Sequence, residues 1–135
     1  MSDTYEEVRI HSESDIVAVR QVVRSLASRM GFGLTDVTRI VTAASELARN
    51  ILRFAGSGVM QWRALTTGSG SGIELTFVDH GPGIADIEQA MQEGYTTSGG
   101  LGLGLPGARR LMGELDIRSE IGKGTTVVVR KWLRQ

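Results

Sequence analysis

The stretch from Ile73 to Gly83 reads IELTFVDHGPG, and the interpretation of the whole chain starts from it. Its first six residues are mostly apolar or β-branched, which predicts a strand that ends at Val78. Asp79 and two glycines follow directly, and this composition is typical of a tight turn. An aspartate at a strand end can also accept hydrogen bonds from a ligand's amino group, while neighbouring glycines let the backbone approach a flat ring. A turn without a ligand is the ordinary alternative.

Upstream of this strand, apolar residues recur at helical spacing and predict two amphipathic helices. The first follows candidate cap residues at positions 12–15 and runs to about residue 30, and the second is capped by Thr35 and runs to about residue 54. Glu46 and Asn50 lie four residues apart on the second helix, so they project from the same face. A carboxylate beside an amide oxygen suits a hard cation, or a base beside a metal ligand. On a helix surface, such a pair is more often simply solvated.

The other expected elements are short, and glycine separates several of them. We expect strands at residues 7–10, 59–65, 115–119 and 125–132, a short helix at 84–92 and another helix at 105–111. Residues 66–72 are rich in glycine and serine and predict the turn of a hairpin. This order predicts an α+β two-layer sandwich, with helices on one face of a mixed β-sheet, formed by one domain over residues 1–135.

Two further glycine-rich segments complete the pattern. The segment from Ser98 to Leu105 reads SGGLGLGL and leads into a predicted helix, where exposed backbone amides suit a phosphate group. We expect residues 93–104 to form a mobile loop, although a plain flexible linker is the alternative. The second segment, GKGT at residues 122–125, enters the last strand and by itself is a hairpin turn.

The order of these motifs resembles the GHKL ATPase superfamily, which includes DNA gyrase, histidine kinases and MutL. Within it, the chain is most similar to the RsbT-like serine/threonine switch kinases of bacterial stress signalling. The similarity lies in SELARNI at residues 45–51, in residues 79–84 and 97–107, and in KWLR at residues 131–134. The resemblance extends over essentially the whole chain and implies the Bergerat ATP-binding fold.

The resemblance also implies roles for individual residues. Glu46 would be the general base or would polarise the attacking hydroxyl group, and Asn50 would ligate Mg²⁺ bound to the phosphates of ATP. Asp79 would accept a hydrogen bond from the adenine amino group, with Gly81 and Gly83 beside the ring. These few groups suffice, because phosphoryl transfer needs mainly positioning and charge neutralisation.

The remaining implied contacts come from the later glycine-rich segments. Gly100, Gly102 and Gly104 would belong to a lid over the phosphates, and Thr125 would help to hold the base. One feature departs from the family pattern, because many family lids carry a basic residue that contacts the γ-phosphate. Residues 86–104 contain no lysine or arginine here, so either basal turnover is slow, or Arg49 or a partner protein supplies that charge.

The implied partners are proteins. RsbT-like kinases phosphorylate STAS-domain proteins and bind a PP2C-type phosphatase that regulates a sigma factor, so we expect both kinds of partner. A second hypothesis keeps the fold and changes the function: the chain would be a binding module gated by ATP, or an anti-sigma factor of the RsbW type. A sensor histidine kinase fits less well, because no phosphoacceptor helix precedes the predicted ATP module.

Composition excludes several other classes. Lysine plus arginine equals aspartate plus glutamate, at 15 each, so no net charge draws the chain to nucleic acid or to a membrane surface. The 135 residues include no cysteine, which excludes disulfides and thiolate metal sites and is compatible with a cytoplasmic protein.

A dinucleotide-binding fingerprint at residues 102–107, with Glu120 downstream, fits by spacing. We reject it, because no strand is predicted before the fingerprint.

Overall fold

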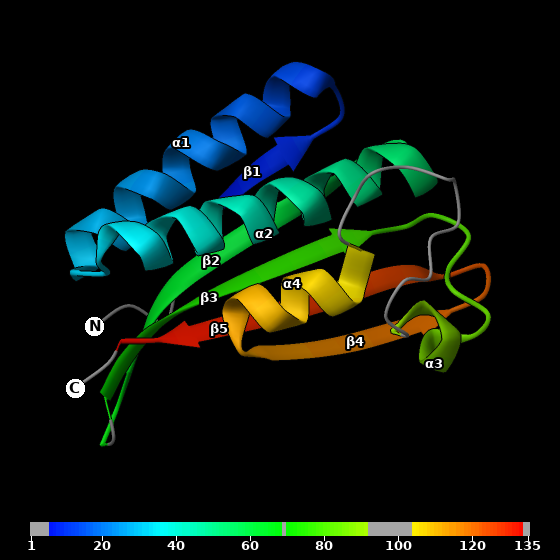
Figure 1. Ribbon diagram of the computed structural model, residues 1–135. Coiled ribbons are helices and arrows are strands. Elements are labelled where there is room, and N and C mark those ends of the chain that lie inside the picture. Colours follow the sequence, from blue (N-terminus) through cyan, green and yellow to red (C-terminus); the bar gives the residue numbers. More distant parts are fainter. Residues whose placement is uncertain (1–5, 69, 92–103, 134–135) are drawn as a thin grey trace.

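A computed structural model of the chain describes residues 6–68, 70–91 and 104–133 (Figure 1). The helices are α1 (Glu13–Met30), α2 (Leu34–Phe54), α3 (Ile87–Ala90) and α4 (Gly104–Met112). The strands are β1 (Glu6–Ile10), β2 (Gly58–Thr67), β3 (Gly70–Asp79), β4 (Glu114–Glu120) and β5 (Gly124–Trp132). The predicted α+β sandwich is confirmed, with α1, α2 and α4 over one face of a five-stranded sheet.

The sheet is antiparallel throughout its described pairs, so the expectation of a mixed sheet is wrong. The strand order is β1-β2-β3-β5-β4, and each neighbouring pair is antiparallel. β4 runs in the same direction as β3, but β5 returns between them and pairs with both. The two parallel strands are therefore never neighbours. This arrangement also differs from the parallel sheet of a dinucleotide-binding fold.

The ends of the long helices follow the sequence signals with one exception. At the start of α1, the backbone N–H of Ser12 donates to Asp15 Oδ2 at 3.1 Å, and Gly31 ends the helix with φ at 100°. For α2, the predicted cap at Thr35 is wrong. The helix already begins at Leu34, and Gly33 in an extended conformation precedes it as the cap. The carbonyl of Gly33 accepts a hydrogen bond from the N–H of Val37. This bond closes the first turn of α2 earlier in the chain than a cap at Thr35 would.

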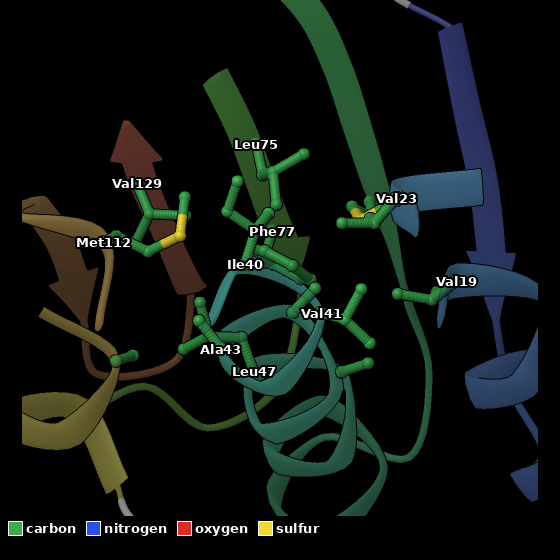
Figure 2. Close-up of a cluster of buried hydrophobic side chains, with 14 of the residues drawn as sticks. Val19, Val23, Ile40, Val41, Ala43, Leu47, Leu75, Phe77, Met112 and Val129 are labelled. Atoms are coloured by element: carbon green, nitrogen blue, oxygen red, sulfur yellow. The ribbon is translucent and has the colours of Figure 1, made fainter. Parts of the chain in front are cut away.

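The core lies between the helices and the sheet (Figure 2). Apolar side chains of α1 pack against α2 and β1, those of α2 against β3, and those of α4 against β4 and β5. Burying these side chains drives the packing of the two layers. The largest fully buried members include Ile40, Met60, Ile73, Leu75 and Met112. Asp79 and Thr125 continue the alternation of core-facing residues past the last apolar residues of β3 and β5, so both side chains lie on the helix-covered face.

The hairpin between β2 and β3 is longer than expected. Pairing extends to Thr67 and Gly70, so most of the predicted turn over residues 66–72 belongs to the strands. Gly72, within this extension, has a packing reason of its own. A β-carbon there would lie 2.7 Å from the ring of Trp132, so the glycine makes room for the indole.

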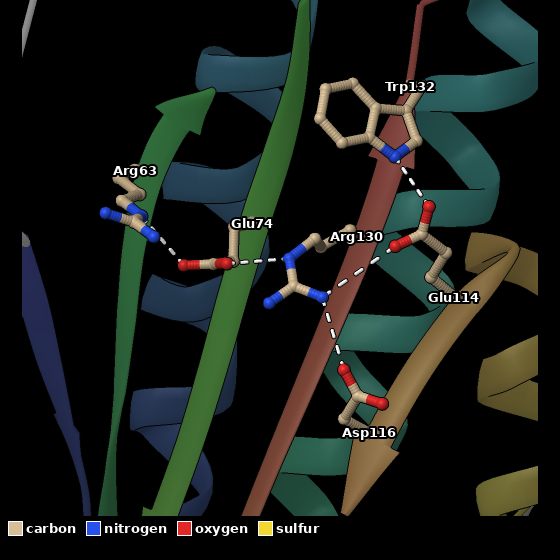
Figure 3. A network of polar contacts seen from close by, with 6 residues as sticks. All are labelled: Arg63, Glu74, Glu114, Asp116, Arg130 and Trp132. Carbon is tan, nitrogen blue, oxygen red and sulfur yellow. Dashed lines mark hydrogen bonds and ion pairs between the residues drawn. The ribbon is translucent and has the colours of Figure 1, made fainter. Parts of the chain in front are cut away.

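No helix covers the other face of the sheet in the described part of the chain, and this face carries a charged network (Figure 3). Glu74 is only 2% exposed and accepts from the Nε atoms of Arg63 and Arg130, each at 2.8 Å. Although partial burial opposes it, the bonds with Glu74 and Asp116 raise the pKa of Arg130 above its ordinary value. The two arginines together neutralise one buried carboxylate, which makes its burial tolerable. In the described residues, no helix has the length and apolar character needed to cross a bilayer.

Candidate functional site

The predicted site residues that the structure describes gather at one end of the sheet. The C-terminal half of α2, the end of β3, the start of α4 and the turn between β4 and β5 all lie at the right-hand end of Figure 1. Ile51 on α2 packs close to Gly58, and Gly58 pairs with Asp79 across the sheet. The last turns of α2 are therefore held over the end of β3.

Glu46 and Asn50 differ in exposure, although they share one face of α2. Glu46 is buried at 8% exposure, and its Oε2 has no hydrogen-bond partner among the described residues. Asn50, one turn further along, is half-buried. Leaving a carboxylate oxygen buried and unpaired is costly, so such an atom usually has a ligand or a reacting group to meet. The alternative of a simply solvated helix pair does not describe Glu46.

Asp79 is the last residue of β3, and its side chain accepts a hydrogen bond from the backbone of the turn that follows. Its Oδ1 accepts from the N–H of Gly81 at 2.9 Å, and its other oxygen, Oδ2, bonds to none of the described residues. Gly81 lies against the end of α2, because a β-carbon there would be 2.6 Å from the side chain of Ala55. The turn is thus held against α2, with one carboxylate oxygen left for another donor.

Gly83 connects this turn to the hairpin of β4 and β5. Its φ is 82°, and a β-carbon there would overlap the carbonyl oxygen of Glu120. The N–H of Gly122 donates to the carbonyl of Pro82 at 2.9 Å, which ties the two turns together. Both the close approach and the left-handed conformation require glycine.

Thr125 lies directly opposite Asp79 in the pairing of β3 with β5, and it is half-buried. On its other side it pairs with Ser119 of β4, and the two hydroxyl oxygens are 2.8 Å apart. The preceding residue, Gly124, approaches the backbone of Asp79 so closely that a β-carbon would overlap the carbonyl oxygen. The GKGT segment is therefore more than a hairpin turn, because it forms one wall of the site.

The predicted lid contributes only its last residue to the described structure. Gly104 is the first residue of α4 and has φ at 67°. Gly100 and Gly102, with most of the loop expected at residues 93–104, lie outside the described residues. Arg109 and Arg110 are exposed in the last turn of α4, and Arg49 is half-buried on α2.

Ser119 belongs to the site, although no sequence motif indicates it. Its Oγ accepts from the N–H of Ile84 at 2.7 Å, donates to the carbonyl of Gly124 at 3.1 Å and contacts the Thr125 hydroxyl. A lone serine in an alternating strand gives no signal of its own. Only the strand pairing that places it beside Thr125 reveals its place in the site.

These residues fit a nucleotide with its metal. A strand-end carboxylate with a free oxygen suits a nucleobase that carries an amino group. The neighbouring glycines have no side chains, so they leave room for the ring beside the backbone. Magnesium is usually bound by one or two protein oxygens together with phosphates and water, which suits the amide oxygen of Asn50 and leaves Glu46 beside it as a base. The start of α4 presents backbone N–H groups, as phosphate sites do.

Comparisons with known proteins identify relatives of this chain. A family model described as the histidine kinase-, DNA gyrase B-, and HSP90-like ATPase matches residues 35–135. The serine/threonine-protein kinase RsbT of Bacillus subtilis (strain 168) is 49% identical over 127 residues, covering 94% of this chain and 96% of that protein. An anti-sigma F factor of Thermoanaerobacter sp. (strain X514) is 32% identical over 120 residues, covering 84% and 82% of the two chains.

Among solved structures, the RsbU and RsbW domains of a Mycobacterium tuberculosis protein match with a TM-score of 0.63 and 21% identity. That match covers 95% of this chain and 32% of the other, longer one, and it supports the fold alone. The family model and the identity with RsbT support more than the fold. The chain belongs to the family of histidine kinase-, DNA gyrase B- and HSP90-like ATPases, and within it to the group of RsbT-like serine/threonine-protein kinases.

Proposed function

We propose that residues 1–135 act as one protein serine/threonine kinase domain, which phosphorylates a STAS-domain partner with ATP and Mg²⁺. After transfer, the kinase is released and binds a PP2C-type phosphatase or another regulator of a sigma factor. The observation that carries the proposal is Glu46, a buried carboxylate with an unpaired oxygen on the same helix face as Asn50. The 49% identity with RsbT supports the same reaction class.

The nucleotide would be held at both ends of the site. Asp79 Oδ2 accepts from the amino group of the base, and Gly81 and Gly83 allow the backbone to lie beside the ring. Asn50 contributes its amide oxygen to Mg²⁺, and Gly104 with the start of α4 faces the phosphates. When bound, ATP with magnesium supplies the phosphoryl group and offsets part of its negative charge.

Glu46 would act on the acceptor side. Its Oε2 accepts the proton of the partner's serine or threonine hydroxyl as that oxygen bonds to the γ-phosphorus of ATP. The bond from the γ-phosphorus to the bridging oxygen breaks in the same transfer, and ADP leaves. Burial keeps water away from this carboxylate and holds it in one orientation. Such proton acceptors typically contribute about 10²–10⁴-fold to the rate.

Release of the partner follows from charge. A phosphorylated side chain carries about −1.5 to −2 charges and would lie beside the phosphates of the remaining ADP. Repulsion should weaken the complex and free the kinase for its second partner. Affinity for the partner with and without the phosphate at its acceptor residue tests this step, and equal or tighter binding of the phosphorylated form would rule it out.

A second candidate function has its own support. The 32% identity with an anti-sigma F factor favours a chain whose main role is to bind a protein, with ATP setting its shape. Labelled ATP mixed with a STAS-domain protein encoded nearby separates the two functions. Label on the partner supports the kinase, whereas a stable complex that depends on ATP and takes no label supports the binding module.

A further inference from the structure

Ser119 Oγ lies at the centre of a small hydrogen-bond network beside the proposed base site. It contacts the N–H of Ile84 at 2.7 Å, the carbonyl of Gly124 at 3.1 Å and the hydroxyl of Thr125 at 2.8 Å. These partners come from the segment after β3 and from the first two residues of β5. One side chain of β4 therefore joins the two segments that border the site.

The directions of these hydrogen bonds follow from the chemistry of the three partners. An amide N–H only donates, and a carbonyl only accepts. Ser119 has a single hydroxyl proton, and it must give this proton to Gly124 if that contact is to be a hydrogen bond. The bond to Thr125 can then form in only one way, with the Thr125 hydroxyl donating to Ser119.

This arrangement fixes what Thr125 can offer a ligand. Because its only proton points at Ser119, the hydroxyl presents acceptor lone pairs in every other direction. Thr125 lies opposite Asp79 on the helix-covered face, and Asp79 Oδ2 also only accepts when it is ionised. Two directly opposed residues therefore offer acceptors on the face of the sheet where the base would bind.

We infer that Ser119 is a positioning residue that sets nucleobase preference by holding the Thr125 hydroxyl as an acceptor. An exocyclic amino group carries two N–H donors and satisfies both acceptors, whereas a carbonyl at that position opposes both. The site therefore selects a 6-aminopurine over a 6-oxopurine. This inference rests on the proposed binding of ATP and adds a residue outside the GKGT and Asp79 segments.

A purely structural role for Ser119 makes a different prediction. If the serine only ties Ile84 to Gly124, its loss would weaken the binding of all nucleotides together. If it acts through Thr125, its loss lets that hydroxyl rotate and donate, so the preference between bases changes. The ratio of ATP affinity to GTP affinity separates the two roles. A general loss of structure in the site would weaken both affinities equally and would leave their ratio unchanged.

The experiment measures ATP and GTP dissociation constants by calorimetry on the full chain with magnesium. We expect Ser119→Ala to lower the ATP-to-GTP preference by about tenfold, the scale of one hydrogen bond. Ser119→Thr keeps a hydroxyl and should retain most of the preference. Thr126→Val is the matched control, because it removes the neighbouring hydroxyl on the opposite face of β5 and should leave the ratio unchanged.

A double mutant tests the route through Thr125. Thr125→Val alone should lower the preference, and adding Ser119→Ala to it should lower it no further. An unchanged ratio in Ser119→Ala, or a full further loss in the double mutant, would overturn the inference. If Ser119→Ala does not fold, an unchanged ratio in Thr125→Val alone would overturn it as well. Other results would contradict the proposed function itself. These are wild-type protein that binds no ATP, or an Asp79→Asn variant that binds ATP normally.

Discussion

Gly124 lies against Asp79 with no space between their backbones, since a β-carbon on the glycine would overlap the carbonyl oxygen of the aspartate. Its φ of 96° also belongs to the left-handed region that glycine favours. This contact joins the GKGT turn to the strand end that carries the proposed base-binding carboxylate. The spacing of the site therefore depends on a residue without a side chain.

Substitution of Gly124 tests this contact. We expect Gly124→Ala to lower the free energy of unfolding by about 3 kcal/mol, because left-handed strain and a steric overlap add together. Gly122→Ala is the matched control in the same turn. It has a similar φ of 83°, but a β-carbon on it would meet nothing within 4 Å, so only the strain, about 1 kcal/mol, should appear. Urea denaturation of both variants measures the difference, and equal losses would contradict the packing argument.

Asp79 and Asn50 should carry nucleotide binding. Asp79→Asn replaces an acceptor by a group that can present a donor, which leaves a polar contact unsatisfied at a cost of about 1–3 kcal/mol. We expect Asn50→Ala to weaken binding in magnesium more than in its absence. Calorimetry with ATP measures both effects. Asp116→Asn, on the far face of the sheet, should bind normally, and unchanged affinity in both site variants would remove the site assignment.

The two helices and the Asp79 turn could be predicted from the sequence, because their periodicity and turn residues are local signals. The two hairpins could be predicted as well, but the pairing of β3 with β5 could not, since β5 enters the sheet between β3 and β4 through contacts distant in sequence. The same limit hides Ser119, because the N–H of Ile84, which donates to its hydroxyl, lies 35 residues away in the sequence. The burial of Glu46 could not be predicted from the sequence either. A glutamate in a helical pattern does not indicate whether neighbouring elements cover it.

The buried carboxylate on the open face should contribute to stability. Glu74→Ala removes the carboxylate that Arg63 and Arg130 share, so each guanidinium group loses a close ion pair. Because both arginines are about 30% exposed, solvent reduces the loss, which we expect to be about 2 kcal/mol. Asp116→Ala removes a carboxylate that is 73% exposed and should cost about 0.5 kcal/mol or less. Denaturant unfolding compares the two, and equal costs would contradict the assigned difference.

Acid should weaken the start of α1. The backbone N–H of His11 donates to Asp15 at 2.9 Å and lowers the pKa of that carboxyl below its ordinary 3.8. A lowered folded-state pKa adds stability above about pH 4, and this stability is lost as the pH falls through the folded value. Asp15→Ala should therefore be less stable than wild type at pH 7, with a smaller difference near pH 3. Thermal unfolding at both pH values measures this, and a constant difference would contradict the assignment.

We propose that Glu46 accepts the proton of the acceptor hydroxyl during phosphoryl transfer, while other residues hold the nucleotide. The most direct measurement follows label from γ-labelled ATP to a STAS-domain partner, with ATP affinity measured on the same preparations. Glu13→Ala, on the exposed start of α1, is the control for loss of a glutamate and should behave as wild type. We predict that Glu46→Ala binds ATP within about threefold of wild type and transfers label about 10²–10⁴-fold more slowly. Transfer at the wild-type rate by Glu46→Ala would contradict the account.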